Sequence, residues 1–168
     1  LQSPDGMINT DLATNSFGQN FNVTMLQLAT GFCSLINGGD YYEPHMVKQI
    51  VDENGGIINN IEPTILRKTI SSETSEFMRN ALFEVVSNGT ARKAQVAGYT
   101  IGGKTGTAEK LPRGNGKYLL SFIGFAPVDD PQVVVYVVID RPNVDHQPHS
   151  TFAQEICKNI MTEILPYM

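Results

Sequence analysis

The chain has 168 residues, of which 41% are hydrophobic and 17% charged, so it has the length and composition of one globular domain and not of a disordered or fibrous protein. Twelve basic against seventeen acidic residues give a net charge of −5, which argues against a nucleic-acid partner because phosphate binding needs a basic surface. The longest apolar run, residues 133–139, is far shorter than the roughly 20 residues of a membrane span.

The first helix is predicted for residues 24–37, because apolar side chains recur there with helical spacing. Thr24 and Gln27 have the spacing of a capping box at its start, and Asn37 with the two glycines that follow provides a stop. The preceding residues, 1–23, are rich in Asn, Asp, Ser and Gly and are expected to form a loop.

A small β hairpin and a second helix are predicted next. The hairpin covers residues 46–58, with Asn54 and Gly55 in the turn, since an Asn-Gly pair accepts positive φ. The helix covers residues 71–87 and carries one apolar face.

Three strands are predicted at residues 99–108, 119–126 and 133–140. The third is apolar at successive positions, as expected for a strand that is covered on both faces. The turn residues at 127–131 make the last two strands an antiparallel hairpin.

The final predicted helix covers residues 151–165, and Thr151 and Gln154 have capping-box spacing. It must bury its apolar stripe against the strands, so the chain is predicted to have an α+β fold. Cys33 and Cys157 fall on the apolar faces of the first and last helices, where buried free thiols are expected; their sequence positions leave a disulfide and the redox compartment open.

The residues that can carry chemistry lie in a glycine-rich segment. Residues 98–105 match the phosphate-binding pattern G-x-x-x-x-G-K-[ST] at every position, which would predict a nucleotide-binding protein. Such a loop follows a buried strand and opens a helix. Residues 92–97 make a poor buried strand, and Gly106 and Pro112 oppose a helix after Lys104. The alternation of side chains instead favours a strand.

On a strand, Lys104-Thr105-Gly106 is the third signature of the serine acyl-transferases that react with penicillin, which also need Ser-x-x-Lys and Ser-x-Asn. Across residues 16–165 the chain resembles the C-terminal half of the transpeptidase domain of penicillin-binding proteins, most closely the monofunctional class B members that cross-link peptidoglycan. The resemblance rests on segments in the family's order: 16–19, 23–27, 36–39, 88–91, 103–109 and 121–127.

The resemblance implies an antiparallel sheet packed with helices, with three strands in this chain and two more supplied by preceding sequence. Residues 1–168 are therefore expected to be the C-terminal portion of a single transpeptidase domain whose N-terminal portion is missing. The chain contains neither Ser-x-x-Lys nor Ser-x-Asn. We therefore expect the nucleophile to lie earlier in the parent protein and the chain alone to be inactive.

In the intact enzyme, the resemblance implies, a serine attacks a D-Ala-D-Ala stem peptide and the acyl group passes to an amine of a neighbouring stem, while penicillin stalls at the first step. Lys104 and Thr107 are predicted to be catalytic: Lys104 places a positive charge beside the cleft, and the Thr107 N–H donates to the oxyanion. The hydroxyls of Thr105 and Thr107 would bind the substrate carboxylate, and Gly106 would let the substrate backbone approach as an added strand. The alternative is that Lys104 is a solvated edge lysine.

The expected partners are peptidoglycan stem peptides and β-lactams, the missing N-terminal part of the same domain, and a second copy through the exposed sheet edge. The parent is expected at the extracytoplasmic face of the cell membrane. Neither a cofactor nor a metal is predicted, since Pro148 prevents helical presentation of His146 and His149. A second hypothesis is a non-catalytic fragment that binds peptides weakly at the Lys104 strand.

Overall fold

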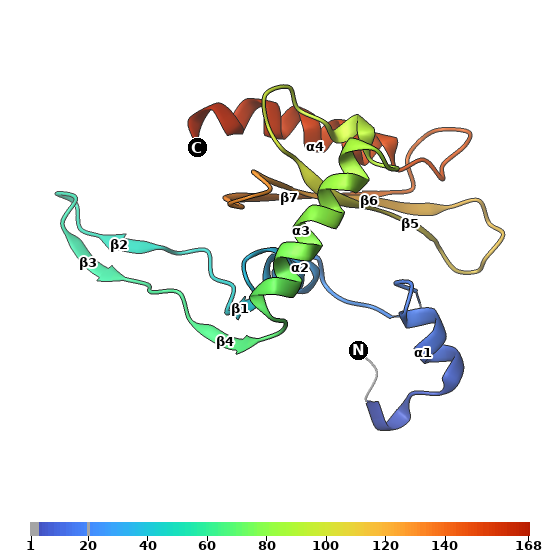
Figure 1. The fold of residues 1–168 in the computed structure, drawn as a ribbon, viewed down its shortest axis with the longest axis horizontal. Helices are drawn as coiled ribbons and strands as arrows, with labels where there is room; N and C mark the ends of the chain where they lie inside the picture. The colour runs from blue at the N-terminus through green and yellow to red at the C-terminus, as the bar shows by residue number, and fades with distance from the viewer. Residues whose placement is uncertain (1–3, 20) are drawn as a thin grey trace.

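A three-stranded antiparallel sheet forms the centre of the computed structural model, which describes residues 4–19 and 21–168 (Figure 1). Its strands are β5 (Gly102–Glu109), β6 (Tyr118–Ala126) and β7 (Val133–Asp140), in the order β5-β6-β7. The three predicted strands and the α+β class are confirmed. The first strand begins three residues later than predicted, because Gly98 adopts a positive φ of 85° and the Tyr99 N–H turns back to the Val96 carbonyl at 3.2 Å.

Helices cover both faces of this sheet. Helix α4 (Thr151–Ile164) packs on one face, against β6 and β7, and α2 (Met25–Ile36) meets the other face (Figure 1). Helix α3 (Ser72–Ser87) packs against β5 and contributes side chains to the cores on both faces. Successive residues of β6 point to opposite faces. Phe122 therefore joins the core beneath α4, and Ile123 joins the core formed with α2 and α3. Side chains of β7 take part in both cores, as the unbroken apolar run predicted.

The starts of all three predicted helices are confirmed to within one residue, but the predicted capping of the last is wrong. Thr24 Oγ1 accepts from the Gln27 N–H at 3.1 Å and Gln27 Oε1 accepts from the Thr24 N–H at 2.9 Å, which is the expected capping box. The predicted box at Thr151 is wrong, because the helix already begins there and Ser150 is the capping residue. Gln154 is buried, and its Nε2 donates to the Thr90 carbonyl at 3.2 Å, so it ties α4 to the loop after α3.

The prediction of a loop over the first 23 residues is wrong for two segments. Pro4–Gly6 forms a 3-10 turn and Asn9–Asn15 forms helix α1. Asp11 accepts from the Ile8 N–H at 3.2 Å, so the acidic and amide residues that are typical of loops serve here at a helix start.

A long two-stranded arm extends away from the sheet (left in Figure 1). Its outer part is the predicted hairpin, in which β2 (Gln49–Val51) pairs with β3 (Ile57–Asn60) and Gly55 turns with a φ of 83°. Its base is a pairing that was not predicted, between β1 (Asp40–Tyr42) and β4 (Ile65–Lys68). The chain also forms short 3-10 turns η2 (Arg92–Ala94) and η3 (Leu165–Tyr167). Within the described ranges, no helix is long and apolar enough to cross a membrane.

Both cysteines are free thiols, as expected, and they differ in burial. Cys157 is fully buried and Cys33 is half-buried; burial raises the pKa of the Cys33 thiol and raises that of Cys157 to about 12. At about pH 8, roughly one Cys157 in ten thousand is then the reactive thiolate. We expect a thiol reagent to modify Cys33 slowly in the native protein and Cys157 only after unfolding, as followed by mass spectrometry. Equal native labelling rates would contradict this packing of α4.

Candidate functional site

The predicted site residues lie on β5, at one margin of the sheet. Lys104 and Thr107 are exposed, and Thr105 and Gly106 are half-buried. Among the described residues, β6 is the only strand that pairs with β5, so the other edge of β5 has no backbone partner. The extended backbone through Lys104 contradicts the phosphate-binding loop, in which a helix would begin at this lysine.

The side chains of these four residues alternate between the two faces of the sheet. Lys104 and Gly106 lie opposite Ile123 and Ser121 of β6 and share the face of α2 and α3, whereas the threonine side chains lie on the α4 face. The free edge runs between the two faces. An extended ligand lying along this edge would therefore meet a cation from one face and hydroxyls from the other.

Lys104 has no acidic partner in the part of the chain that the structure describes. Its Nζ donates to the Thr105 carbonyl at 2.9 Å. The ammonium group has two further protons, so it is available to a carboxylate that arrives from outside the chain. This arrangement suits the binding of a peptide that ends in a carboxylate.

The glycines of β5 leave room for side chains of β6. A Cβ on Gly102 would lie 2.4 Å from Cε1 of Phe125, and a Cβ on Gly103 would lie 2.5 Å from Cζ of Phe122. At Gly106 a Cβ would lie 2.4 Å from Oγ of Ser121. Packing inside the sheet is thus a reason for these glycines that does not depend on a ligand.

Ser121 and Tyr136 form a polar pair on the face that Lys104 shares. Burial raises the pKa of the Tyr136 phenol, and a hydrogen bond with the Ser121 side chain acts in the opposite direction. Sequence analysis did not single out either residue, because Ser121 lies in an apolar strand and its neighbour across the sheet is set by the register. The one available signal was a serine at an otherwise apolar position.

The two histidines that were weighed as metal ligands lie in the loop before α4. The rings of His146 and His149 pack edge to face with their centroids 4.7 Å apart. Over residues 4–19 and 21–168 there is no group of three or more His, Cys, Asp or Glu side chains placed to hold a metal ion.

Comparison with known proteins agrees with this fold. The penicillin binding protein transpeptidase domain family matches residues 2–162. Stage V sporulation protein D of Bacillus subtilis is 44% identical over 160 residues, which cover 92% of this chain and 24% of that protein. The peptidoglycan D,D-transpeptidase FtsI homolog of Mesostigma viride is 32% identical over 173 residues, which cover 94% and 29%. The chain thus spans about a quarter of the length of these curated relatives.

A solved structure gives the same result for the fold. The transpeptidase domain of penicillin-binding protein 3 from Burkholderia pseudomallei aligns with a TM-score of 0.74 at 28% identity, over all of this chain and 51% of that one. The helices and the antiparallel sheet described above are therefore arranged as in a transpeptidase domain.

Proposed function

Because the chain belongs to the penicillin-binding protein transpeptidase domain family, we propose that it is the C-terminal portion of the catalytic domain of a class B peptidoglycan D,D-transpeptidase. The observation that carries this proposal is the edge of β5 that pairs with no strand in residues 4–19 and 21–168, where Lys104 has no acidic partner among these residues and Thr107 is exposed. The missing serine nucleophile comes from the part of the domain that precedes this chain.

In this proposal the stem peptide lies along the β5 edge as an added strand. The ammonium group of Lys104 and the hydroxyls of Thr105 and Thr107 bind its terminal carboxylate. The serine oxygen attacks the carbonyl carbon between the two D-alanines, and the terminal D-alanine leaves as the acyl-enzyme forms. The Thr107 N–H donates to the oxyanion of this step, and the acyl group then passes to an amine of a neighbouring stem. Penicillin acylates the same serine and stops there.

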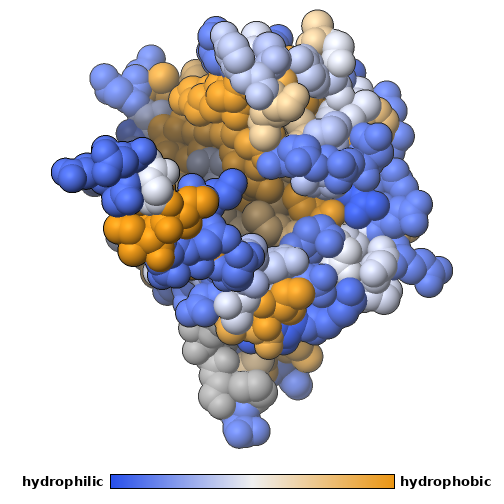
Figure 2. Space-filling view, turned by 90° about the vertical axis from the view of Figure 1, so that its left-hand side faces the viewer, coloured by the Kyte–Doolittle hydropathy of each residue, from blue (hydrophilic) through white to orange (hydrophobic). Residues whose placement is uncertain are grey.

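Among the described residues β7 pairs only with β6, and in this proposal the preceding part of the same domain pairs with its other edge. On the side of the molecule that Figure 2 shows, hydrophobic side chains gather in a deep hollow with a hydrophilic rim. An apolar surface of this kind is typical of an interface, because its exposure to water is unfavourable. In the parent protein, which we place at the extracytoplasmic face of the membrane, the N-terminal part of the domain covers it. A second copy of the chain is the alternative occupant.

A fluorescent penicillin tests the proposed function. We expect covalent label on the complete transpeptidase domain and none on the 168-residue chain, because the chain has no Ser-x-x-Lys or Ser-x-Asn. Gel fluorescence and peptide mapping would locate the label, with heat-denatured protein as the control. An unlabelled complete domain would disprove the function and favour a non-catalytic peptide-binding fragment. Label on the isolated chain would disprove the prediction that this chain lacks the nucleophile.

A further inference from the structure

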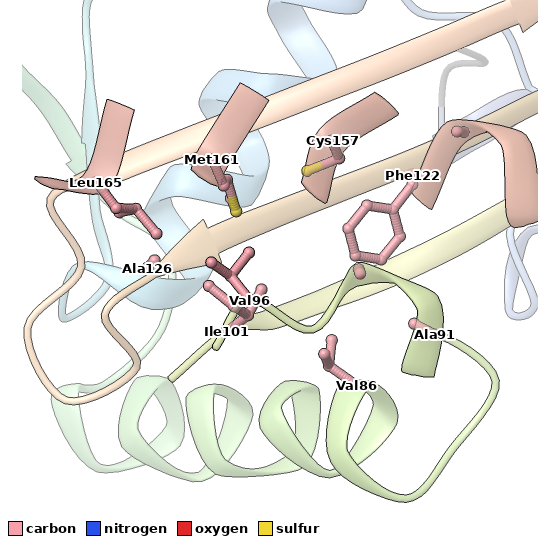
Figure 3. Packing of buried hydrophobic residues seen from close by; sticks show 11 residues of the cluster. Val86, Ala91, Val96, Ile101, Phe122, Ala126, Cys157, Met161 and Leu165 are labelled. Atoms are coloured by element: carbon pink, nitrogen blue, oxygen red, sulfur yellow. The ribbon is translucent and has the colours of Figure 1, made fainter. Parts of the chain in front are cut away.

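One hollow is lined by none of the β5 residues of the proposed reaction. It has a volume of about 430 Å³ and lies where the end of α3, the η2 turn and α4 meet. Val86, Val96 and Ile101 form its apolar floor, and Figure 3 shows them lying between α3 and α4. All three are at most 6% exposed, so the floor belongs to the packed core and is well ordered in shape.

The rim of this hollow carries three cations, Arg92, Lys93 and Lys158. Among the residues that the structure describes, the lining includes no carboxylate, and none of the three cations forms an ion pair. Arg92 uses Nε to donate to the Gly89 carbonyl at 3.2 Å, which leaves the other guanidinium protons available. The chain as a whole has a net charge of −5, so three unpaired cations around one hollow are a local reversal of its charge.

The wall between floor and rim is fixed by hydrogen bonds. Gln95 Nε2 donates to the carbonyls of Val86 and Ser87 at 3.0 and 3.1 Å, which holds the η2 segment against the end of α3. The Tyr99 side chain, 40% exposed, lines the opening. The hollow therefore combines a rigid apolar base, an aromatic side and a cationic mouth.

We propose that this hollow, the cation pocket, binds an organic anion that has a phosphate or carboxylate on a short apolar body. Charge-assisted hydrogen bonds from the three cations would hold the anionic group, and the apolar floor would take the body. The volume lies within the range of roughly 300–1,000 Å³ that is usual for small-molecule sites. The pocket uses none of the residues assigned to the transpeptidase reaction, so it is a separate site.

Calorimetry with hexyl phosphate on the complete transpeptidase domain tests this proposal. We expect one hexyl phosphate per domain, with an affinity about tenfold higher than that of inorganic phosphate because the apolar floor adds to binding. The Lys93→Gln/Lys158→Gln double variant should weaken binding by at least about tenfold, and added salt should weaken it further. Lys48→Gln, which removes an exposed lysine of the arm, is the matched control and should bind normally.

Vesicles identify the source of the anion. Binding to phosphatidylglycerol but not phosphatidylcholine vesicles, lost in the double variant, would assign the pocket to a lipid headgroup; hexyl phosphate binding without vesicle binding would assign it to a soluble ester. Labelling by fluorescent penicillin at the normal rate would show that the double variant is folded. Failure to bind hexyl phosphate at millimolar concentration, or binding that the double variant leaves unchanged, would overturn the proposal whether or not the domain is acylated.

Discussion

Replacing Lys104 by alanine in the complete transpeptidase domain is expected to lower the second-order rate constant of acylation by penicillin about 10- to 100-fold, because a hydrogen bond between charged groups contributes about 1.5–3 kcal/mol. The ammonium group lies at the open edge of β5 and has no carboxylate partner in the described ranges of the chain. Its charge is therefore available to the carboxylate of the substrate or the antibiotic. The second-order rate constant of labelling by a fluorescent penicillin measures the effect.

Two further variants separate this role from a general effect of charge. Lys104→Arg keeps the positive charge but changes its shape, so it should retain part of the rate. Lys48→Ala removes an exposed lysine of the arm and should leave the rate unchanged. If Lys104→Ala acylates as fast as the unsubstituted domain, Lys104 is only a solvated edge lysine that discourages aggregation.

The elements that could be predicted are those whose signal is local. Helices α2, α3 and α4 have apolar residues at helical spacing, and their bounds agree with the prediction to within one or two residues. The β2–β3 hairpin was likewise contained in one short segment with its own Asn-Gly turn. Each of these patterns lies within one continuous segment, so the element can be predicted without knowing the rest of the fold.

The elements that were missed depend on partners far along the chain. Strand β1 has only three residues, and it is a strand because β4, which begins 23 residues after β1 ends, pairs with it. The late start of β5 has a long-range cause beside the local turn at Gly98: Thr100 Oγ1 accepts from the Val128 N–H at 3.0 Å, which helps to hold this residue outside the ladder. The amino-acid composition near these residues does not indicate such long-range contacts.

The site was predicted only in part, because some of its groups are also brought together by residues far apart in the chain. Alternation along residues 99–104 and the Lys-Thr-Gly signature placed Lys104 on a strand, and the structure confirms the strand. The polar pair of Ser121 and Tyr136 arises from the register between β6 and β7, and the cation pocket joins Arg92 to Lys158 through the packing of α4 against η2. These groupings exist only in the folded chain.

Packing inside the sheet, and not a ligand, requires a glycine at position 103. Gly103→Ala is therefore expected to lower the free energy of unfolding by about 1–3 kcal/mol through overpacking. A Cβ there would lie 2.5 Å from Cζ of Phe122 and 2.7 Å from the carbonyl oxygen of Ile123. Phe122 is fully buried, and the carbonyl belongs to the neighbouring strand. Neither atom can move without disturbing the β5–β6 ladder.

Gly106→Ala is the matched control, because it makes the same chemical change three residues further along the same strand. Its Cβ would lie 2.4 Å from Oγ of Ser121, but the serine hydroxyl can turn to another staggered rotamer at the cost of its hydrogen bond with the Tyr136 side chain, about 0.5–1.5 kcal/mol, without moving the backbone. Both substitutions restrict the unfolded chain equally, by about 0.4–1 kcal/mol, so the difference between them isolates the clash at Gly103. Urea unfolding of the complete domain measures it. Equal stabilities for the two variants would mean that β5 shifts away from β6 easily, and that the side chains of Phe122 and Phe125 do not fix the position of the Lys104 strand.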